Sequence, residues 1–149
     1  MRRRRWIIGL SLLGAAAGQV VTAYQTGLVR HLPDPPGPFD ADRVDASDYA
    51  FRRAQSPDGA IMIVTYALTA WLAAAGGPDR RPVLPLLLAA KTLGDLGTDL
   101  KLAREEWQEN HAFCAYCQAA TVLSAVSAAL AVPDAVRAVR SRSGSGAGK

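Results

Sequence analysis

Three long runs without a single formal charge limit what this chain can fold into. They cover residues 6–24, 59–77 and 112–132, and each has about the 20 residues needed to cross a hydrocarbon core of roughly 30 Å. A fourth run, residues 82–100, is apolar over its first half and then carries three charged side chains. The pattern predicts an all-α fold, an integral membrane four-helix bundle whose third span is the weakest.

The mean hydropathy of +0.07 is low for such a protein, but the apolar residues are concentrated in these blocks. With 149 residues, one domain is expected. We predict a transmembrane domain over residues 1–137 and a disordered basic tail over residues 138–149. Small residues such as Gly14 and Gly18 are expected to let helices approach closely.

The basic N-terminus followed by an apolar run also fits a secretory signal peptide. The run is longer than the usual apolar core of a signal, and its small residues fall inside it rather than after it. We therefore expect a retained helix.

The distribution of Lys and Arg predicts the orientation of the bundle, because basic residues accumulate on cytoplasmic flanks. With the N-terminus inside, the inner segments hold ten basic residues and the longer outer segments hold six. Acidic residues gather in the outer segments. The sequence thus predicts a multi-pass protein of a bacterial-type inner membrane with both termini in the cytoplasm.

The segment between the first two spans is too long and polar for a turn. Residues 32–38 are proline-rich and extended. From about Ser47 a short amphipathic helix is expected, with Tyr49 and Phe51 against the membrane surface. This predicts a long outer loop that covers the mouth of the bundle.

Charged residues in the third run allow two interpretations. Lys91 and Asp95 are four positions apart and can pair on one face, with Asp99 continuing the stripe. Such groups at membrane depth usually face a bundle interior. Alternatively, the helix is short and these residues lie near its outer end.

Cys114 and Cys117 are the only two cysteines, and they lie near the start of the last apolar run. Their spacing puts both on one helical turn, where they could form a readily reduced disulfide. A helix N-terminus favours the thiolate, and His111 would add to this effect when protonated. The alternative to a redox pair is that the two cysteines are only small buried apolar residues.

Metal and haem sites fit the cysteine pair less well. His111 and the two thiols supply three potential zinc ligands, and no second C-x-x-C or H-x-x-x-H completes a site. Haem attachment needs a histidine directly after the second cysteine, where Gln118 stands. We predict no metal.

The arrangement resembles the vitamin K epoxide reductase (VKOR) family. The likeness rests on Phe113-Cys114-Ala115-Tyr116-Cys117 and, more loosely, on residues 44–50 leading to Ser56-Pro57 and the second span. It implies an enzyme in which the C-x-x-C exchanges electrons with a quinone of menaquinone or ubiquinone type held between the helices. Cys117 would face the quinone, and Cys114 would receive electrons from a separate thioredoxin-like thiol donor.

The sequence departs from the family in the first outer loop. Relatives that oxidise other proteins usually carry a second cysteine pair in the first outer loop, whereas this chain has Ala46-Ser47 where the later one would fall. Serine cannot exchange disulfides. The shuttle to the C-x-x-C is therefore missing.

Four polar residues are the candidates for contacting a quinone: Tyr24, Asp58, Gln118 and Thr121. Two functional hypotheses follow. The first is a VKOR-like quinone-linked thiol–disulfide oxidoreductase with membrane lipid as its surroundings. The second is a non-catalytic four-helix membrane protein that acts as a partner or assembly subunit. The N-terminal arginines are interpreted as a topology signal rather than a nucleic-acid patch.

Overall fold

The computed structural model describes residues 2–47, 57–75 and 81–145, and over these residues the chain is helical with no β-strand. α1 spans Arg2–Gln25, α2 Ala41–Asp45, α3 Asp58–Ala74, α4 Val83–Asn110 and α5 Ala115–Ser145. The prediction of an all-helical fold is confirmed for this part of the chain.

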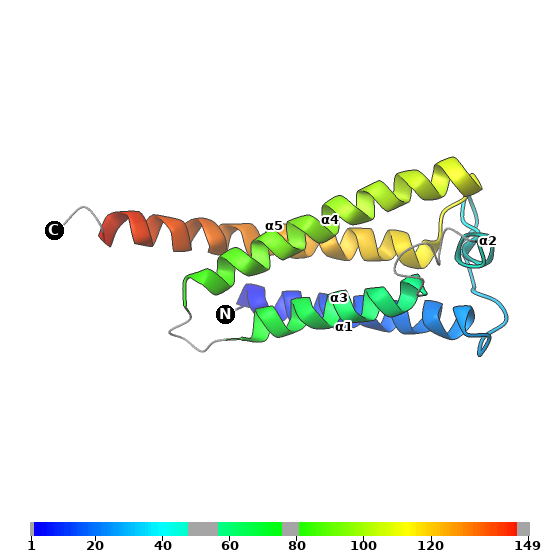
Figure 1. Cartoon of the computed structure of the whole chain (residues 1–149), viewed down its shortest axis with the longest axis horizontal. Helices are drawn as coiled ribbons and strands as arrows, with labels where there is room; N and C mark the ends of the chain where they lie inside the picture. The colour runs from blue at the N-terminus through cyan, green and yellow to red at the C-terminus, as the bar shows by residue number, and fades with distance from the viewer. Residues whose placement is uncertain (1, 48–56, 76–80, 146–149) are drawn as a thin grey trace.

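Four long helices lie side by side and set the shape of the molecule (Figure 1). α1 packs along α3 and α4 packs along α5, while a contact between α1 and α5 joins the two pairs. α2 and the first turn of α5 lie at one end, and the two chain termini lie toward the other (Figure 1). At that second end, Arg4 Nε donates a hydrogen bond of 2.7 Å to the Ala73 carbonyl. Arg3 Nη1 forms an ion pair with Asp134 Oδ1 at 3.6 Å.

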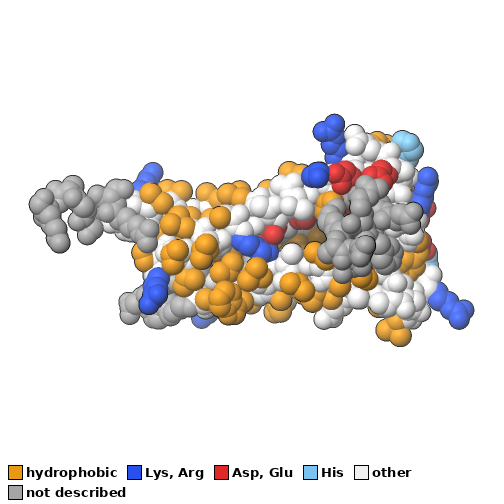
Figure 2. Space-filling view, in the orientation of Figure 1, with side chains coloured by type: hydrophobic (Ala, Val, Ile, Leu, Met, Phe, Trp, Pro, Cys, Tyr) orange, Lys and Arg blue, Asp and Glu red, His pale blue; other side chains and the backbone are white. Residues whose placement is uncertain are grey.

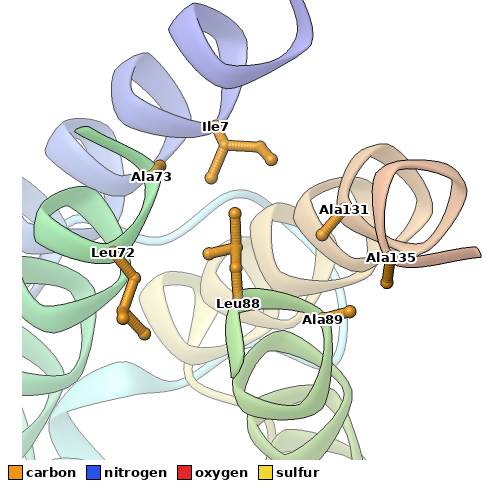
Figure 3. Close-up of a cluster of buried hydrophobic side chains, with 7 residues drawn as sticks. All are labelled: Ile7, Leu72, Ala73, Leu88, Ala89, Ala131 and Ala135. Atoms are coloured by element: carbon orange, nitrogen blue, oxygen red, sulfur yellow. The ribbon is translucent and has the colours of Figure 1, made fainter. Parts of the chain in front are cut away.

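The core near the termini is built from small and branched apolar side chains. Ile7 of α1 and Leu88 of α4 point toward one another between the helices (Figure 3). Alanines from α3, α4 and α5 surround them and let the backbones approach. The full cluster is Ile7, Leu72, Ala73, Leu88, Ala89, Ala131 and Ala135.

Toward the α2 end, α1 and α3 approach each other through glycines. A Cβ atom built on Gly18 would lie 2.9 Å from the Gly59 carbonyl oxygen, and one built on Gly14 would lie 2.5 Å from the Tyr66 ring. Neither distance is compatible with a real side chain. The expectation of close helix approach at Gly14 and Gly18 is confirmed.

Large apolar side chains remain exposed on the outside of the long helices. Hydrophobic side chains cover much of the middle of the face in Figure 2, and the charged ones gather mostly toward the ends. Leu12, Leu13 and Trp71 are each 62% exposed. Soluble monomers rarely leave so much contiguous apolar surface open to water, so these faces fit contact with lipid.

Two of the described helices, α1 and α5, are long and apolar enough to cross a membrane. α3 is apolar but has only 17 residues, against the 19 predicted for residues 59–77. α4 continues past the predicted span, residues 82–100, through a polar stretch to Asn110. By length and composition, α1 and α5 qualify as membrane spans, and the four-span bundle stays a prediction.

Two further elements differ from the sequence-based expectation. α5 passes through Pro133, a residue type that ends or bends a helix, and reaches Ser145. Residues 138–145 are therefore helical, where a disordered tail was predicted. A proline removes one backbone hydrogen bond, and the alanine-rich sequence on both sides still favours helix. The described loop helix is Ala41–Asp45, earlier than the one expected from Ser47, most of which lies in residues 48–56, outside the described residues.

Candidate functional site

The segment just before α5 is fastened to the loop that follows α1. Phe113 N donates a hydrogen bond to the Pro38 carbonyl at 2.9 Å, and Asp40 N donates one to the Phe113 carbonyl at 3.0 Å. These bonds form an isolated bridge between Phe39 and Phe113, whose ring centroids are 6.4 Å apart. The bridge brings α2, which begins two residues after Phe39, against the start of α5.

Acidic side chains order this loop by accepting backbone N–H groups. Asp40 caps α2 by accepting from an N–H in its first turn at 3.0 Å. Asp34 accepts from the first N–H of α2 at 2.6 Å, and Asp42 accepts from Leu32 N at 2.8 Å. The charge pattern assigned these residues to an outer loop, and their contacts show how the loop is held in place.

Cys114 and Cys117 lie together at the start of α5, both as free thiols. The Cys117 N–H donates to Cys114 Sγ at 3.3 Å. The sulfur of Cys114 thus occupies the position of a helix-capping acceptor. The expectation that the two cysteines meet on one helical turn is confirmed.

The two thiols face different surroundings. Cys114 is fully buried and packs in a cluster with Leu32, Ala41 and Val44 from the loop. Cys117 is only partly buried and lines a cavity between the helices. The pair therefore connects the loop side of the protein with its interior.

Two buried carboxylates flank the thiol pair. Asp45, the last residue of α2, is 1% exposed and interacts with the Cys114 thiol. Glu106 of α4 is 2% exposed and interacts with the Cys117 thiol. Glu106 Oε2 also accepts from Gln118 Nε2 at 3.0 Å and from Cys114 N at 3.4 Å.

Burial makes both carboxylates unusually weak acids. Burial raises the pKa of Asp45 to about 6, against a smaller lowering by its contact with the Cys114 thiol. Burial likewise raises the pKa of Glu106 to about 7, although the hydrogen bonds from Cys114 N and Gln118 favour its charged form. Both groups consequently exchange protons near neutral pH.

These carboxylates change the expected electrostatics of the thiols. The start of α5 favours a thiolate, but the Asp45 carboxylate lies within 4.8 Å of both sulfur atoms and disfavours a second negative charge. His111 is exposed at the left-handed C-cap of α4, and its ring meets Trp107 edge-on at 6.1 Å. The environment of the thiols is set by acids rather than by this histidine.

The cavity beside Cys117 has a volume of about 170 Å³ and lies between α3, α4 and α5. Its apolar walls come from Ile61, Met62, Leu102 and Ala120. Its polar lining comprises Asp58, Thr65, Tyr66, Asp95, Thr98, Asp99, Glu106, Gln118, Thr121 and Ser124. Although many of these residues are polar, most of the surface that they expose to the cavity is apolar. Such a pocket beside a thiol suits a flat organic ring that carries oxygen acceptors.

Three of the four residues predicted to contact a quinone line this cavity. They are Asp58, Gln118 and Thr121. The fourth, Tyr24, lies elsewhere: it packs beside the loop cluster around Cys114, and its hydroxyl donates to the Asp42 carbonyl at 3.1 Å. Tyr24 thus packs with the loop residues around Cys114 and does not line the cavity.

Three residues that the structure places at the site were not predicted to lie there. Tyr66, in the wall of the cavity, donates to the Ala120 carbonyl at 2.8 Å. Asp45 and Glu106 flank the thiols. A tyrosine inside a span is a recognisable signal, but no spacing distinguishes Asp45 or Glu106 from the other acids of the outer segments.

The charged residues of the third run face the interior. Lys91 Nζ lies 2.6 Å from Asp95 Oδ2 and donates to the Thr65 carbonyl of α3, also at 2.6 Å. Asp95 and Asp99 line the cavity. The structure therefore supports the interior interpretation over a helix that ends near these residues.

Asp45, Cys114 and Cys117 bring three donor atoms within 4.8 Å of one another. Structural zinc sites use four protein ligands, and no larger group is found among the described residues. We assign no metal to this cluster.

Comparison with protein families gives one match. The model of the vitamin K epoxide reductase family matches residues 5–132. This stretch includes nearly all of α1, the loop with α2, all of α3 and α4, and both cysteines with the first half of α5. No curated protein matches the chain.

Proposed function

Because the chain belongs to the vitamin K epoxide reductase family, we propose that it is a membrane quinone-linked thiol–disulfide oxidoreductase whose Cys114 and Cys117 cycle between dithiol and disulfide. Membership of this family suggests a membrane oxidoreductase that is linked to quinone and thiols. The assignment of that chemistry to these two cysteines is our own.

One observation carries the proposal: a thiol of the pair lines an apolar cavity among the long helices. Cys117 contributes to the wall, while Cys114 lies on the loop side. A quinone supplies the capacity to accept two electrons and two protons. Gln118 would hold a quinone oxygen, because its amide nitrogen has a second N–H besides the one that it donates to Glu106. Thr121 and Tyr66 donate their hydroxyl groups to the Cys117 and Ala120 carbonyls, so they would shape the wall of the cavity.

Electrons would enter at Cys114 from a separate thioredoxin-like donor. This thiol is fully buried, and Leu32, Ala41 and Val44 of the loop pack against it. A donor thiol must approach along the S–S axis to attack a disulfide, so the loop cover has to open for each reduction. Because the loop carries no cysteine pair, the donor would react with Cys114 directly.

We place the protein in a bacterial-type inner membrane with α1, α3, α4 and α5 all crossing and both termini in the cytoplasm. The arginines at the start of α1 and those near the end of α5 lie at the same end of the bundle (Figure 1), as the positive-inside rule requires. The opposite end, with α2 and the thiols, then faces the oxidising compartment, where disulfides persist.

The test is turnover in membranes that contain the protein. Reduction of a water-soluble quinone analogue by dithiothreitol is measured for the parent and for Cys114→Ala and Cys117→Ala. The proposal predicts that each variant loses activity to the background level. Full activity of Cys117→Ala would overturn it and favour the alternative, a non-catalytic membrane protein that serves as a partner or assembly subunit.

A further inference from the structure

The feature that the proposed function leaves unexplained is the pair of carboxylates beside the thiols. Asp45 and Glu106 are among the most deeply buried charged residues of the described chain, at 1% and 2% exposure. Neither forms an ion pair with Lys, Arg or His in the part of the chain that is described. Burying two acids without cations is costly for a fold, which points to a role beyond stability.

Each carboxylate interacts with a different thiol of the pair, although the Asp45 carboxylate also lies within 4.8 Å of the Cys117 sulfur. Asp45 interacts with Cys114 and comes from α2, on the loop side. Glu106 interacts with Cys117 and comes from α4, where it also lines the cavity. A proton leaving Cys114 therefore has Asp45 beside it on the loop side, and a proton leaving Cys117 has Glu106 beside it at the cavity.

The bonds of Glu106 hold its carboxylate in place against the pair. Oε2 accepts from Gln118 Nε2 at 3.0 Å and from the Cys114 backbone N–H at 3.4 Å. Asp45 is less constrained, since its Oδ2 has no hydrogen-bond partner among the described residues. An acceptor oxygen beside each thiol is the geometry that a general base requires.

Resting on the proposed function, we propose that Asp45 and Glu106 are catalytic residues: Asp45 accepts the proton of Cys114, and Glu106 accepts the proton of Cys117, when the pair is oxidised. The surroundings create the need for such bases. Both thiols lie close to acidic groups, so the thiols do not ionise readily on their own. The raised pKa values of the two acids, near neutral, suit the task.

Oxidation of the thiol pair by the quinone conserves atoms and electrons. Two S–H bonds break, one S–S bond forms, and two electrons pass to the quinone. Glu106 gives its proton to the cavity, where the quinone takes it up. Asp45 gives its proton to water on the loop side, and the quinone draws its second proton from water, so the products are one disulfide and one hydroquinone.

Other acids face the same pair and must be considered in any pH measurement. Asp58 of α3 and Asp34 and Asp42 of the loop all act electrostatically on Asp45. Asp45 in turn acts on Glu106. Variants of single residues separate these contributions.

The experiment measures how fast the reduced full-length protein is oxidised by a soluble quinone in a single turnover, from pH 6 to pH 10. The variants are Glu106→Gln and Asp45→Asn, with Glu105→Gln as the matched control. Glu105 is the neighbouring acid on α4 and pairs with Lys101 on the surface. Disulfide formation is read as the loss of two maleimide-reactive thiols.

We expect each variant to lose about 100-fold in rate at pH 7, within the range of general base catalysis. The loss should shrink as the pH is raised, because the thiols then ionise without help. Glu105→Gln should follow the parent throughout. Glu106→Asp, which keeps a carboxylate on a shorter arm, should recover part of the rate.

Two results would overturn the inference: rates equal to the parent at every pH, or a loss that stays constant with pH, which marks a structural defect. If Glu106→Gln does not fold, the profile of Asp45→Asn decides. A parent whose thiols are not oxidised by quinone at all refutes the proposed function itself. The failure of that function and the failure of this inference are thus distinguishable.

Discussion

Replacing Glu106 by glutamine should stabilise the folded protein at pH 8. Burial raises the pKa of this carboxyl from 4.5 to about 7. Between these values the folded state keeps the proton and the unfolded state has lost it. The stability that depends on this proton is therefore fully present below pH 4.5 and is lost as the pH rises through 7.

The size of the effect follows from the shift. One pKa unit corresponds to about 1.4 kcal/mol, so the shift of Glu106 amounts to about 3 kcal/mol. Glutamine has the same shape, and its amide oxygen can still accept from Gln118 and from Cys114 N, but it carries no charge to bury. We expect Glu106→Gln to gain up to about 3 kcal/mol over the parent at pH 8, leaving the pH dependence due to Asp45.

The assay is thermal unfolding of the detergent-solubilised protein, followed by tryptophan fluorescence at pH 5 and pH 8. The parent should melt at a lower temperature at pH 8 than at pH 5, and the variant should lose roughly half of that difference. Glu105→Gln, a surface acid on the same helix, should behave like the parent. If the parent is equally stable at both pH values, or if Glu106→Gln melts with the parent at each, the reasoning is refuted.

Two other substitutions test the packing around the cavity. Gly14→Ala should destabilise the protein by about 1–3 kcal/mol, because the new Cβ would lie 2.5 Å from the Tyr66 ring. The control Gly9→Ala, whose new Cβ would have nothing within 4 Å, should be neutral or slightly stabilising. Equal melting temperatures for the two variants would contradict the close approach of α1 and α3. Lys91→Met should lower the stability by about 1–3 kcal/mol, since it leaves the Asp95 carboxylate at the cavity without its cation. The control Lys101→Met, on the exposed surface, should lower the stability by under about 1 kcal/mol. Similar losses for both variants would argue that Lys91 faces solvent.

The parts of the fold that were predictable are those set by local composition. The uncharged runs predicted the positions of α1, α3 and α5, because long apolar stretches favour helix in a membrane. The spacing of Cys114 and Cys117 predicted their contact for the same local reason. The short helix α2 was not predicted, because its position depends on the backbone bridge between Phe39 and Phe113, which pairs residues far apart in the sequence.

The site was predictable only in part, for a similar reason. Gln118 and Thr121 lie one helical turn from Cys117 or less, so their place at the cavity follows from helix periodicity. Glu106 reaches the thiols because α4 continues past residue 100 and turns back at His111. No local pattern separates Glu106 from its acidic neighbours, and only the three-dimensional packing does.

The central claim is that Cys114 and Cys117 form one redox couple that a quinone oxidises. The direct measurement is maleimide labelling of the reduced protein in its membrane before and after addition of a soluble quinone, read as a mass shift. The account predicts two labels before quinone and none after, with one hydroquinone formed per protein. Two labels both before and after, with the quinone unreduced, would contradict it.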